Sequence, residues 1–568
     1  MKNRQINSEF KIAIVGGGSA GYLAALTLRA FHPTVDITLI ESSKIPIIGV
    51  GEATTSEIVP FLHRVLGFDQ AEFYREVLPT WKLGIKFFWG PGENAYFNYP
   101  FDRGPLLEAY LFDGHSHNST FLSALMSADR VPVLANGGSP TSLLSKVPFA
   151  YHLDNKRFVQ YLQKKSAERN IRHLDHEIVD AVVCPDGQTI DSLITSDGQI
   201  LTYDFYVDCT GYRSFLMEKK LGGFFQSYQS SLFTDSAIVA NAPHNGTIKP
   251  YTAAETMDNG WCWSIPQRDE DHLGYVFSSA FCSPDEAMTE MQSKHPNLDG
   301  LRRVKFRSGR LDRFVKGNVA AIGNSYGFVE PLESTGIFVI CRESLLLAQN
   351  LDTLQADRST RAFMNTSVAE MWDYLRWFLA VHYRFNTRSN SPFWQECRAH
   401  ADISGATGHL AAFKKNAPLH FHSTDAGPCG GHNFNEYGYD VMFFGQGISS
   451  KYSQPHLSRE EYSLHVREVQ ALTGNSMSQC AALHLLSEKP EMLHDLLSEE
   501  TWISALHLGM QRVCRYVREG KSEAAPPIPL NNYRGDQESA IYENIPAIQV
   551  DPWLCQRPGL GNNPSVHV

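Results

Sequence analysis

The chain has 568 residues, with 50 Lys and Arg against 61 Asp and Glu, a formal net charge of -11 and a pI near 6.1. A chain of this length is expected to fold as two or three modules, and an acidic balance without a basic run excludes electrostatic capture of nucleic acid. The polar start MKNRQINSEF has no signal-peptide core, no apolar run is long enough to span a bilayer, and the ten cysteines form no CxxC pair, so we expect a cytoplasmic protein with reduced thiols.

The N-terminal region predicts a dinucleotide site. KIAIVGGGSAGYLAALTLRAF has the pattern of a buried strand, a glycine turn and a helix, and VDITLIES that of a second strand ending in Glu41. In the turn, Gly16, Gly18 and Gly21 form GxGxxG, in which the glycines permit a tight turn, close approach to a pyrophosphate and close packing of helix on strand. The helix N-terminus attracts the phosphate charge, and Glu41 is placed to accept a hydrogen bond from a ribose hydroxyl.

The next two segments are predicted to be a glycine-containing loop feeding an amphipathic helix, at 45–68, and a strand region, at 79–98. In PTWKLGIKFFWG, apolar residues alternate with Lys82, Gly84 and Lys86, which is the period of a strand. Local pattern alone predicts an edge strand with solvated lysines, since lysine on an exposed edge blocks aggregation.

The remaining chain alternates between strand-rich and helical segments. Residues 100–150 are predicted to be loop-rich, 151–170 helical, 230–310 β-rich, and those beyond 360 mostly helical. The predicted fold class is α/β: an FAD-binding Rossmann-like module of the FAD-dependent monooxygenase type at 10–345, with an inserted β-rich substrate region at about 80–150 and 225–310, a mainly helical substrate-side module at 346–520, and an extended or partly mobile tail at 521–568.

Two later segments favour FAD over NAD. FYVDCTGYRS is a predicted strand that ends in Asp208, Thr210 and Gly211, and GNVAAIGNSYGFVEP is a predicted strand that runs into a glycine turn. Three cofactor-touching segments spread along the chain resemble the FAD-dependent monooxygenase fold. No second GxGxxG follows a predicted strand, so the reducing equivalents are expected to arrive from elsewhere.

Four ordered motifs between about 10 and 450 resemble the flavin-dependent halogenases, especially their tryptophan and indole branch. GWCWSIP matches the signature GWxWxIP, and FVEPLESTG matches the family's Phe-Pro-Ser-Gly signature. IGVGEAT matches the strap that lies against the flavin, and HYRFNTRSNSPFW resembles the HYxxxxRxxxPFW helix segment. The two signatures are carried by Gly260, Trp261, Trp263, Ile265 and Pro266, and by Phe328, Pro331, Ser334 and Gly336.

The resemblance implies a reaction. A separate NAD(P)H-dependent reductase supplies FADH2, oxygen gives a flavin hydroperoxide, and a bound halide attacks it to form hypohalous acid. The acid travels through a tunnel to a lysine that faces the aromatic substrate. The family's (F/Y/W)KxxI strand aligns this lysine with Lys82, and Lys86 keeps its interpretation as a solvated lysine. An amine is nucleophilic only when neutral, and apolar surroundings that lower the pKa of Lys82 would suit this role.

The resemblance also assigns the other site residues. Glu333 matches the catalytic glutamate, which orients the lysine-bound oxidant or accepts the ring proton, and Thr335 and Gly336 match the halide site. Trp261 and Trp263 keep the substrate from reaching the flavin, with Ser334 as a further supporting residue. The predicted cofactor-binding residues are Gly16, Gly18, Ser19, Ala20, Gly21, Glu41, Val50, Gly51, Glu52, Ala53, Ile178, Asp208, Gly211, Gly323, Phe328 and Ile337, and no metal ligand is expected.

Plainer interpretations stay open for several of these side chains. The two tryptophans of GWCWSIP are also typical of core aromatics, Glu333 of an acid favoured by a helix dipole, Ser334 of a cap, and Asp208 of a structural strand end. For the whole chain, the alternatives are a flavin hydroxylase or oxidase that uses the hydroperoxide directly, and a non-catalytic FAD-binding protein. The pairing of Lys82 with Glu333 and the GWxWxIP motif favour halogenation.

The substrate side departs most from the family pattern. Asn324 stands where many FAD monooxygenases carry an aspartate, and YGYDVMFFGQGI at 437–448 resembles the family's C-terminal aromatic segment only loosely. No residues match those that grip the amino-acid part of free tryptophan. The predicted substrate is therefore an indole-type ring, in tryptophan, indole, an alkaloid or a peptide. The expected partners are the reductase and this small molecule, with a homodimer possible and no nucleic acid or membrane.

Overall fold

A computed structural model describes residues 9–45, 52–92, 95–135, 140–244, 246–354, 358–421 and 434–488. The predicted cofactor residues Val50 and Gly51 and the predicted tail at 521–568 lie outside the described residues. The predicted division of the rest into modules stays a prediction.

The first layer of the fold is a six-stranded sheet in the order β10-β2-β1-β14-β23-β22. The strands from β10 to β23 are parallel and β22 is antiparallel to β23. They are β1 (Lys11–Val15), β2 (Asp36–Glu41), β10 (Arg172–Asp175), β14 (Phe205–Asp208), β22 (Val315–Lys316) and β23 (Val319–Ala321). The near-continuous apolar run of β1 is explained by burial on both faces, as in parallel sheets generally.

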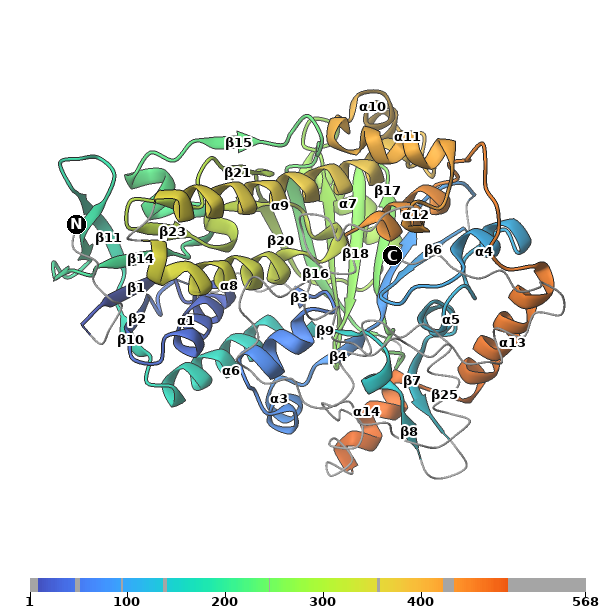
Figure 1. Cartoon of the computed structure of the whole chain (residues 1–568), viewed down its shortest axis with the longest axis horizontal. Helices are drawn as coiled ribbons and strands as arrows, with labels where there is room; N and C mark the ends of the chain where they lie inside the picture. Colours follow the sequence, from blue (N-terminus) through green and yellow to red (C-terminus); the bar gives the residue numbers. More distant parts are fainter. Residues whose placement is uncertain are drawn as a thin grey trace, which may run out of the picture. The chain divides into compact units, whose positions relative to one another are not determined.

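Helices cover this sheet and carry the chain on to the next layer. Figure 1 shows α1 (Ser19–Phe31) and α6 (Asn155–Glu168) close to the parallel strands, with α8 (Gly336–Leu354) and α9 (Arg358–Phe385) running beside them. The three segments predicted to touch the cofactor follow β1, β14 and β23, which are neighbours in the sheet. Their carboxyl ends therefore meet at one edge, where open α/β sheets bind their ligands.

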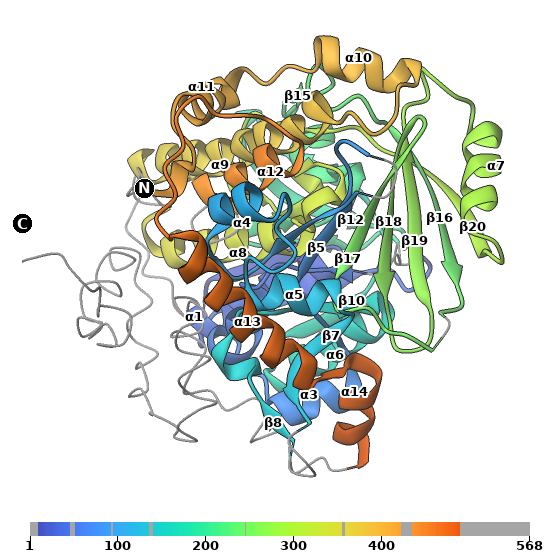
Figure 2. The ribbon, with the colours of Figure 1, turned by 90° about the vertical axis from the view of Figure 1, so that its right-hand side faces the viewer.

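The second layer is a seven-stranded sheet in the order β20-β16-β19-β18-β17-β5-β6. Its neighbouring strands are antiparallel except for β17 and β5, which are parallel, and Figure 2 shows α7 (Pro284–Lys294) packed on the outer face. The strands are β5 (Gly84–Phe88), β6 (Phe97–Pro100), β16 (Ser236–Ala242), β17 (Thr252–Met257), β18 (Gly260–Pro266), β19 (Asp271–Phe277) and β20 (Asp299–Lys305). This is the β-rich region that the sequence predicted at 230–310, joined by two strands from 84–100.

The prediction of solvated lysines on an edge strand is wrong. β5 is flanked by β17 and β6, and the side chain of Lys86 is only 5% exposed. Its Nζ donates a hydrogen bond to the carbonyl of Met126 at 2.9 Å and lies over the rings of Tyr96 and Tyr251. The covering strand β17 lies far along the chain, so a local pattern holds no information about it.

The region at 100–150 is also more regular than predicted. It holds α4 (Leu106–Phe112), α5 (Phe121–Ser127), β7 (Arg130–Leu134), β8 (Thr141–Ser142) and β9 (Ala150–Leu153). β9 pairs with both β3 (Glu52–Ala53) and β4 (Thr80–Lys82), which fixes the strand of Lys82 in a small three-stranded sheet. β7 pairs with β25 (Ser476–Ser478), so this region is completed by residues near the end of the described chain.

The helical prediction beyond 360 is confirmed up to residue 488. After α9 come α10 (Pro392–His400), α11 (Thr407–Lys415), α12 (Glu436–Gly445), α13 (Arg459–Asn475) and α14 (Gln479–Glu488). Ser391 and Ser458 cap α10 and α13 by accepting hydrogen bonds from backbone N–H groups. The segment at 45–68 ends, as predicted, in helical structure, with α2 (Ile58–Pro60) continued by Phe61–Val65, and a further helix, α3 (Gln70–Glu76), follows it.

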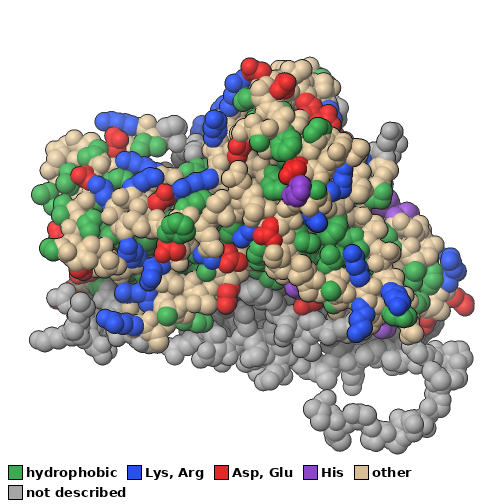
Figure 3. All heavy atoms as spheres, turned by 90° about the horizontal axis from the view of Figure 1, so that it is seen from above, with side chains coloured by type: hydrophobic (Ala, Val, Ile, Leu, Met, Phe, Trp, Pro, Cys, Tyr) green, Lys and Arg blue, Asp and Glu red, His purple; other side chains and the backbone are tan. Residues whose placement is uncertain are grey.

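The face seen in Figure 3 carries basic and acidic side chains intermixed, without a block of one sign. Among the described cysteines, none is in a disulfide. No helix in the described part of the chain combines the length and the apolar character needed to cross a bilayer.

Candidate active site

The side chain of Lys82 is fully enclosed at the end of β4. Its Nζ donates to the carbonyl oxygen of Thr54 at 2.9 Å and to Oγ of Ser334 at 2.7 Å, and lies 5.6 Å from the ring centre of Phe101. Burial lowers the pKa of Lys82 to about 7, against the opposing effect of the nearby carboxylate of Glu333. A neutral amine has two N–H groups, so these two acceptors use both and leave its lone pair available.

A sharp turn brings Ser334 to this amine. Residues Pro331–Glu333 form one short 3-10 turn, and Ser334 ends it with φ +60°, a left-handed conformation that is costly for a residue other than glycine. α8 starts two residues later, at Gly336. The hydroxyl of Ser334 accepts the hydrogen bond from Lys82, a contact that a role as a cap alone does not explain.

Glu333 is buried beside Ser334 and has a partner that the sequence prediction missed. Its Oε1 lies 2.6 Å from Nε2 of His382, and both side chains are almost completely enclosed. Burial raises the pKa of Glu333, while His382 and Lys82 oppose this shift. His382 belongs to the HYRFNTRSNSPFW segment in α9, so the motif contained the residue without giving its role.

The two tryptophans of GWCWSIP lie in β18 with their ring centres 5.9 Å apart. Both are buried in the main core cluster, which agrees with the plainer interpretation as core aromatics. The Nε1 of Trp261 donates to Glu330 at 3.2 Å, and Glu330 also accepts from Thr234. Their role in keeping substrate from the flavin stays a prediction, and Glu330 is a second buried carboxyl group that the sequence prediction missed.

The glycine turn after β1 fits the phosphate part of a dinucleotide. Gly16 has φ +118°, and a Cβ on it would overlap the carbonyl oxygen of Cys209 in the segment after β14. A Cβ on Gly21 would overlap the carbonyl of Gly16, as expected for close packing of helix on strand. Gly18 is different, since a Cβ there would meet nothing within 4 Å, and it begins α1 without a side-chain cap. Uncapped N–H groups facing open space are what a pyrophosphate requires.

The other residues near this turn are joined to the chain itself. Ser19 donates to Asn155, and Ala20 lies against the third segment, with its Cβ 3.2 Å from where a Cβ on Gly323 would stand. Glu41 ends β2 and accepts a hydrogen bond from the hydroxyl of Tyr22 at 2.6 Å. The contact of Ala20 with Gly323 places the first and third predicted segments side by side.

Asp208 ends β14, and its carboxylate is occupied by its own chain. It accepts hydrogen bonds from the backbone N–H groups of Thr210, Leu216 and Met217. This favours the structural alternative over a direct flavin contact. Gly211 follows with φ +64°, a conformation that glycine adopts without strain.

The remaining predicted cofactor residues lie in several elements. Glu52 and Ala53 form β3, and burial raises the pKa of Glu52 to about 7. Phe328 has its ring centre 5.1 Å from that of Tyr212, beside Gly211. Ile337 is buried in the first turn of α8, whereas Ile178 lies in β11 (Ile178–Val183), which belongs to a separate three-stranded sheet.

The predicted halide residues are at the N-terminus of α8. Thr335 is buried, and a Cβ on Gly336 would meet nothing within 4 Å. The N-terminus of this 19-residue helix favours an anion through its free N–H groups and its dipole. The N-terminus of α8, which starts two residues after Ser334, is therefore suited to hold a halide ion.

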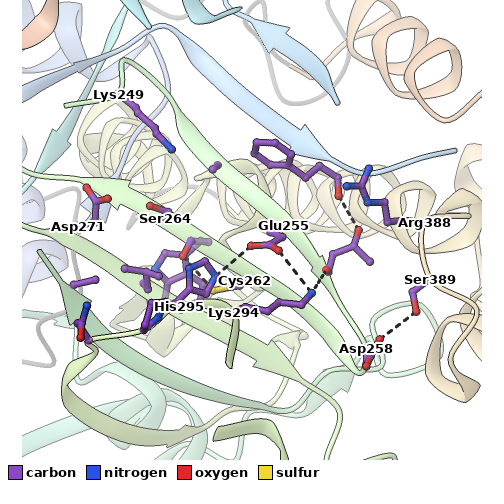
Figure 4. A pocket seen from close by; sticks show the side chains of 18 of the residues that line it. Lys249, Glu255, Asp258, Cys262, Ser264, Asp271, Lys294, His295, Arg388 and Ser389 are labelled. Carbon is purple, nitrogen blue, oxygen red and sulfur yellow. Dashed lines mark hydrogen bonds and ion pairs between the residues drawn. The ribbon is translucent and has the colours of Figure 1, made fainter. Parts of the chain in front are cut away.

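A polar cleft of about 870 Å³ lies on the outer face of the seven-stranded sheet. Ala253, Cys262 and Ser264 line it from one face of β17 and β18, and Trp263 also borders it, whereas Trp261 does not. Figure 4 shows Lys294 and His295 turned toward Glu255, to which they lie within 3.6 Å. Neither Lys82 nor Glu333 lines this cleft, so the candidate chemistry is elsewhere.

Within the described ranges, no group of three or more His, Cys, Asp or Glu side chains is arranged to hold a metal ion. Histidines in this part of the chain have other contacts: His420 lies 2.7 Å from Asp440, and His115 and His117 stack on each other.

Comparison with known proteins gives one consistent result. The family model described as tryptophan halogenase matches residues 11–461. The tryptophan 7-halogenase RebH of Lentzea aerocolonigenes is 33% identical over 428 residues, which cover 70% of this chain and 80% of RebH. The tryptophan 6-halogenase SttH of Streptomyces toxytricini is 30% identical over 499 residues, 81% of this chain and 94% of SttH.

Solved structures agree. MibH, described as a "lathipeptide tryptophan 5-halogenase", has 42% identity and a TM-score of 0.83, and the match covers 90% of this chain and 98% of MibH. The structure of SttH has 29% identity and a TM-score of 0.76, covering 84% of this chain and all of SttH. These matches confirm the predicted fold class, with its Rossmann-type FAD-binding architecture.

Proposed function

The chain belongs to the tryptophan halogenase family, and we propose that it is a flavin-dependent halogenase that halogenates the indole ring of a peptide-borne tryptophan at the Lys82 amine. The observation that carries the proposal is the environment of Lys82. A fully buried amine with a pKa of about 7, held by two acceptors beside the buried carboxyl of Glu333, combines a free lone pair with a nearby acid–base group. Hydroxylation would need neither of these groups, and the relatives reported above are all named halogenases.

FAD is the cofactor of this proposal, and when bound in its reduced form with oxygen it supplies the oxidant that converts halide to hypohalous acid. The uncapped turn of Gly18 would hold its pyrophosphate, and Glu41 its ribose. Thr335 and Gly336 would hold chloride or bromide at the N-terminus of α8. A separate NAD(P)H-dependent reductase would supply the reduced flavin, in keeping with the lack of a second dinucleotide fingerprint in the sequence.

Lys82 acts as the point of release for the halogen. Its N–H groups are fixed by Thr54 and Ser334, so the lone pair can hold hypohalous acid or form a haloamine at one location. Holding the reagent within reach of one ring carbon replaces an unselective reaction by a selective one. Glu333 then serves as the acid–base group for the ring proton.

A peptide substrate is favoured by two observations. The structure with the highest identity among those reported above, MibH, carries the word lathipeptide in its description and matches nearly its whole length to this chain. The sequence also has no match to the residues that grip the amino-acid part of free tryptophan. An indole presented by a peptide needs no such grip on a free amino and carboxyl group.

The test uses the full chain with FAD, an NADH-dependent flavin reductase, NADH, oxygen and either chloride or bromide. Substrates are free tryptophan, tryptophan blocked at both ends, and linear and cyclic peptides that each contain one tryptophan. Mass spectrometry should show a halogen in place of hydrogen in the peptides, and tandem spectra should place it on the indole. Exclusive halogenation of free tryptophan would overturn the peptide proposal, and hydroxylated product alone would overturn halogenation.

The lysines of one strand region provide a matched control. Lys82→Met should abolish product while hypohalous acid is still formed and trapped by monochlorodimedone. Lys86→Met removes the other lysine of this region, whose amine donates to the carbonyl of Met126 rather than to Ser334, and should retain product.

A further inference from the structure

The contacts of His382 show which of its ring nitrogens carry a hydrogen. Nδ1 of His382 lies 3.0 Å from the carbonyl oxygen of Phe378, one turn earlier in α9. A carbonyl only accepts, so Nδ1 must carry a hydrogen. On the other side, Nε2 lies 2.6 Å from Oε1 of Glu333, a distance that also needs a hydrogen between the two atoms.

These two contacts fix the number of protons. Either the imidazole is charged and Glu333 is a carboxylate, or the imidazole is neutral and Glu333 is a carboxylic acid. Both forms contain one proton on Nδ1 and one shared between Nε2 and Oε1. The two side chains therefore form a couple with no net charge that keeps one mobile proton beside the amine of Lys82.

The surroundings keep this proton inside the site. The imidazole ring lies against Phe87, Trp89 and Phe378, with ring centres 5.3, 6.5 and 5.3 Å away. His382 is completely buried and these neighbours are apolar. Among the described residues, Glu333 is therefore the group to which Nε2 of His382 can pass a proton. His382 is also in the last turns of α9, where the helix dipole favours a positive charge.

The charged and titratable groups facing the couple come from three other elements. Lys82 of β4 interacts with Glu333, Glu330 with His382, and Tyr99 of β6 with Glu333. Burial lowers the pKa of Lys82 to about 7. The protonation of the couple and of the amine must therefore be considered together.

We propose that His382 is a positioning residue that maintains the mobile proton on Glu333, so that Glu333 gives a proton to the oxygen leaving hypohalous acid and takes one back from the ring. This inference rests on the proposed function. The halogen–oxygen bond breaks as the carbon–halogen bond forms, and the departing hydroxide takes the proton of the couple to become water. The ring then loses its proton to Glu333 while the bonding pair restores aromaticity. The balance is arene plus hypohalous acid to haloarene plus water, and the couple is unchanged.

This role explains why a carboxylate alone would be less suited to the site. A lone buried carboxylate can accept the ring proton but has none to give the leaving oxygen. A lone carboxylic acid could give its proton and then regain one from the ring, so what His382 adds is a second group that holds this proton while Glu333 is a carboxylate. The couple gives the proton once and regains it once, so its net charge is the same before and after the cycle.

The experiment compares the wild type with His382→Gln, His382→Asn and His382→Phe. The amide of Gln reaches the place of Nε2 and can donate to Glu333, but it does not take up or release a proton. We expect His382→Gln to bind FAD and to form trappable hypohalous acid at the wild-type rate, with kcat for indole halogenation lower by about 10²-fold and KM unchanged. A His382→Gln variant within about threefold of the wild type in kcat, with the same pH profile, would show that His382 only holds Glu333 in place.

A spectroscopic readout separates this inference from the proposed function. With ¹⁵N-labelled histidine, the signal lost in His382→Gln identifies His382, and its Nδ1 should be protonated in the wild type. In Glu333→Gln the shared proton should disappear and leave the neutral Nδ1–H tautomer. A wild-type Nδ1 without hydrogen would overturn the couple, whether or not any indole is halogenated. If the wild type halogenates no indole while the tautomer is as expected, the proposed function fails and the proton count stands.

Discussion

Halogenation should follow the ionisation of Lys82. The pKa of this amine is lowered from 10.5 to about 7 by burial. At pH 7 about half of the amine is then neutral, whereas an unshifted lysine would be neutral in about 3 molecules in 10⁴, so burial raises the reactive fraction by about 10³-fold. We expect kcat for halogenation to rise about tenfold per pH unit below pH 7 and to level off above about pH 8.

The same shift has a cost in stability, whose sign can be worked out. The unfolded chain holds the lysine proton up to about pH 10.5, and the folded chain releases it above about pH 7. Between these values the unfolded state binds more protons, so stability rises with pH across this window. The cost of burying the amine is full below pH 7, at about 5 kcal/mol, and is lost by about pH 10.5.

Lys82→Met and Lys82→Arg test both consequences. Lys82→Met should halogenate nothing, yet its midpoint of thermal unfolding should be equal to or above that of the wild type at pH 6.5, with the difference shrinking by pH 9. Lys82→Arg keeps a cation that does not lose its proton, so it should lose halogenation while hypohalous acid is still trapped. The assay measures halogenated peptide by mass spectrometry and trapped oxidant by absorbance in the same reaction. A rate independent of pH between 6 and 8.5, or an active Lys82→Arg variant, would refute a neutral amine as the reactive form.

The other predictions concern the acid–base group, the cofactor turn and the second lysine. Glu333→Gln should lower kcat for halogenation by about 10²-fold or more while oxidant formation continues, and a near-normal rate would remove Glu333 from the chemistry. Gly21→Ala should abolish FAD binding in a fluorescence titration, because its Cβ would overlap the carbonyl of Gly16. Gly18→Ala should fold and bind FAD more weakly than the wild type. If both variants bind FAD with the affinity of the wild type, this turn does not hold the phosphates. Lys86→Met should keep halogenation and change stability by about 1–3 kcal/mol, since it leaves a buried carbonyl without its donor; loss of halogenation with an intact fold would place Lys86 in the chemistry.

The sequence predicted the parts of the site that depend on local chemistry. GxGxxG, the strand before it and Glu41 are consecutive in one supersecondary unit, so their geometry follows from a short stretch of chain. Lys82 and Glu333 were identified by motif rather than by geometry. The partner His382 was missed because it is brought to Glu333 by the packing of α9, and a polar residue in a helical motif does not show which group it faces.

Burial was the property hardest to predict, and the two lysines show why. Lys82 and Lys86 are four residues apart in one strand-like segment, so an alternating pattern places both on the same face. The structure buries both, through β9 and the turn of Ser334 for Lys82 and through β17 and α5 for Lys86. Each covering element comes from a distant part of the chain, so the residues around the two lysines could not show that their face is covered.

Burial alone does not decide which lysine is reactive. Lys86 lies over two tyrosine rings, 4.7 and 4.1 Å from their centres, and such faces stabilise a cation. Its pKa is lowered only to about 8, so it is mostly charged at pH 7. Lys82 has no such pair of rings, and its two acceptors can be satisfied by a neutral amine. What the N–H groups and the lone pair of each amine face therefore adds to the effect of burial, and placing two tyrosine rings against Lys82 should suppress halogenation by favouring its charged form.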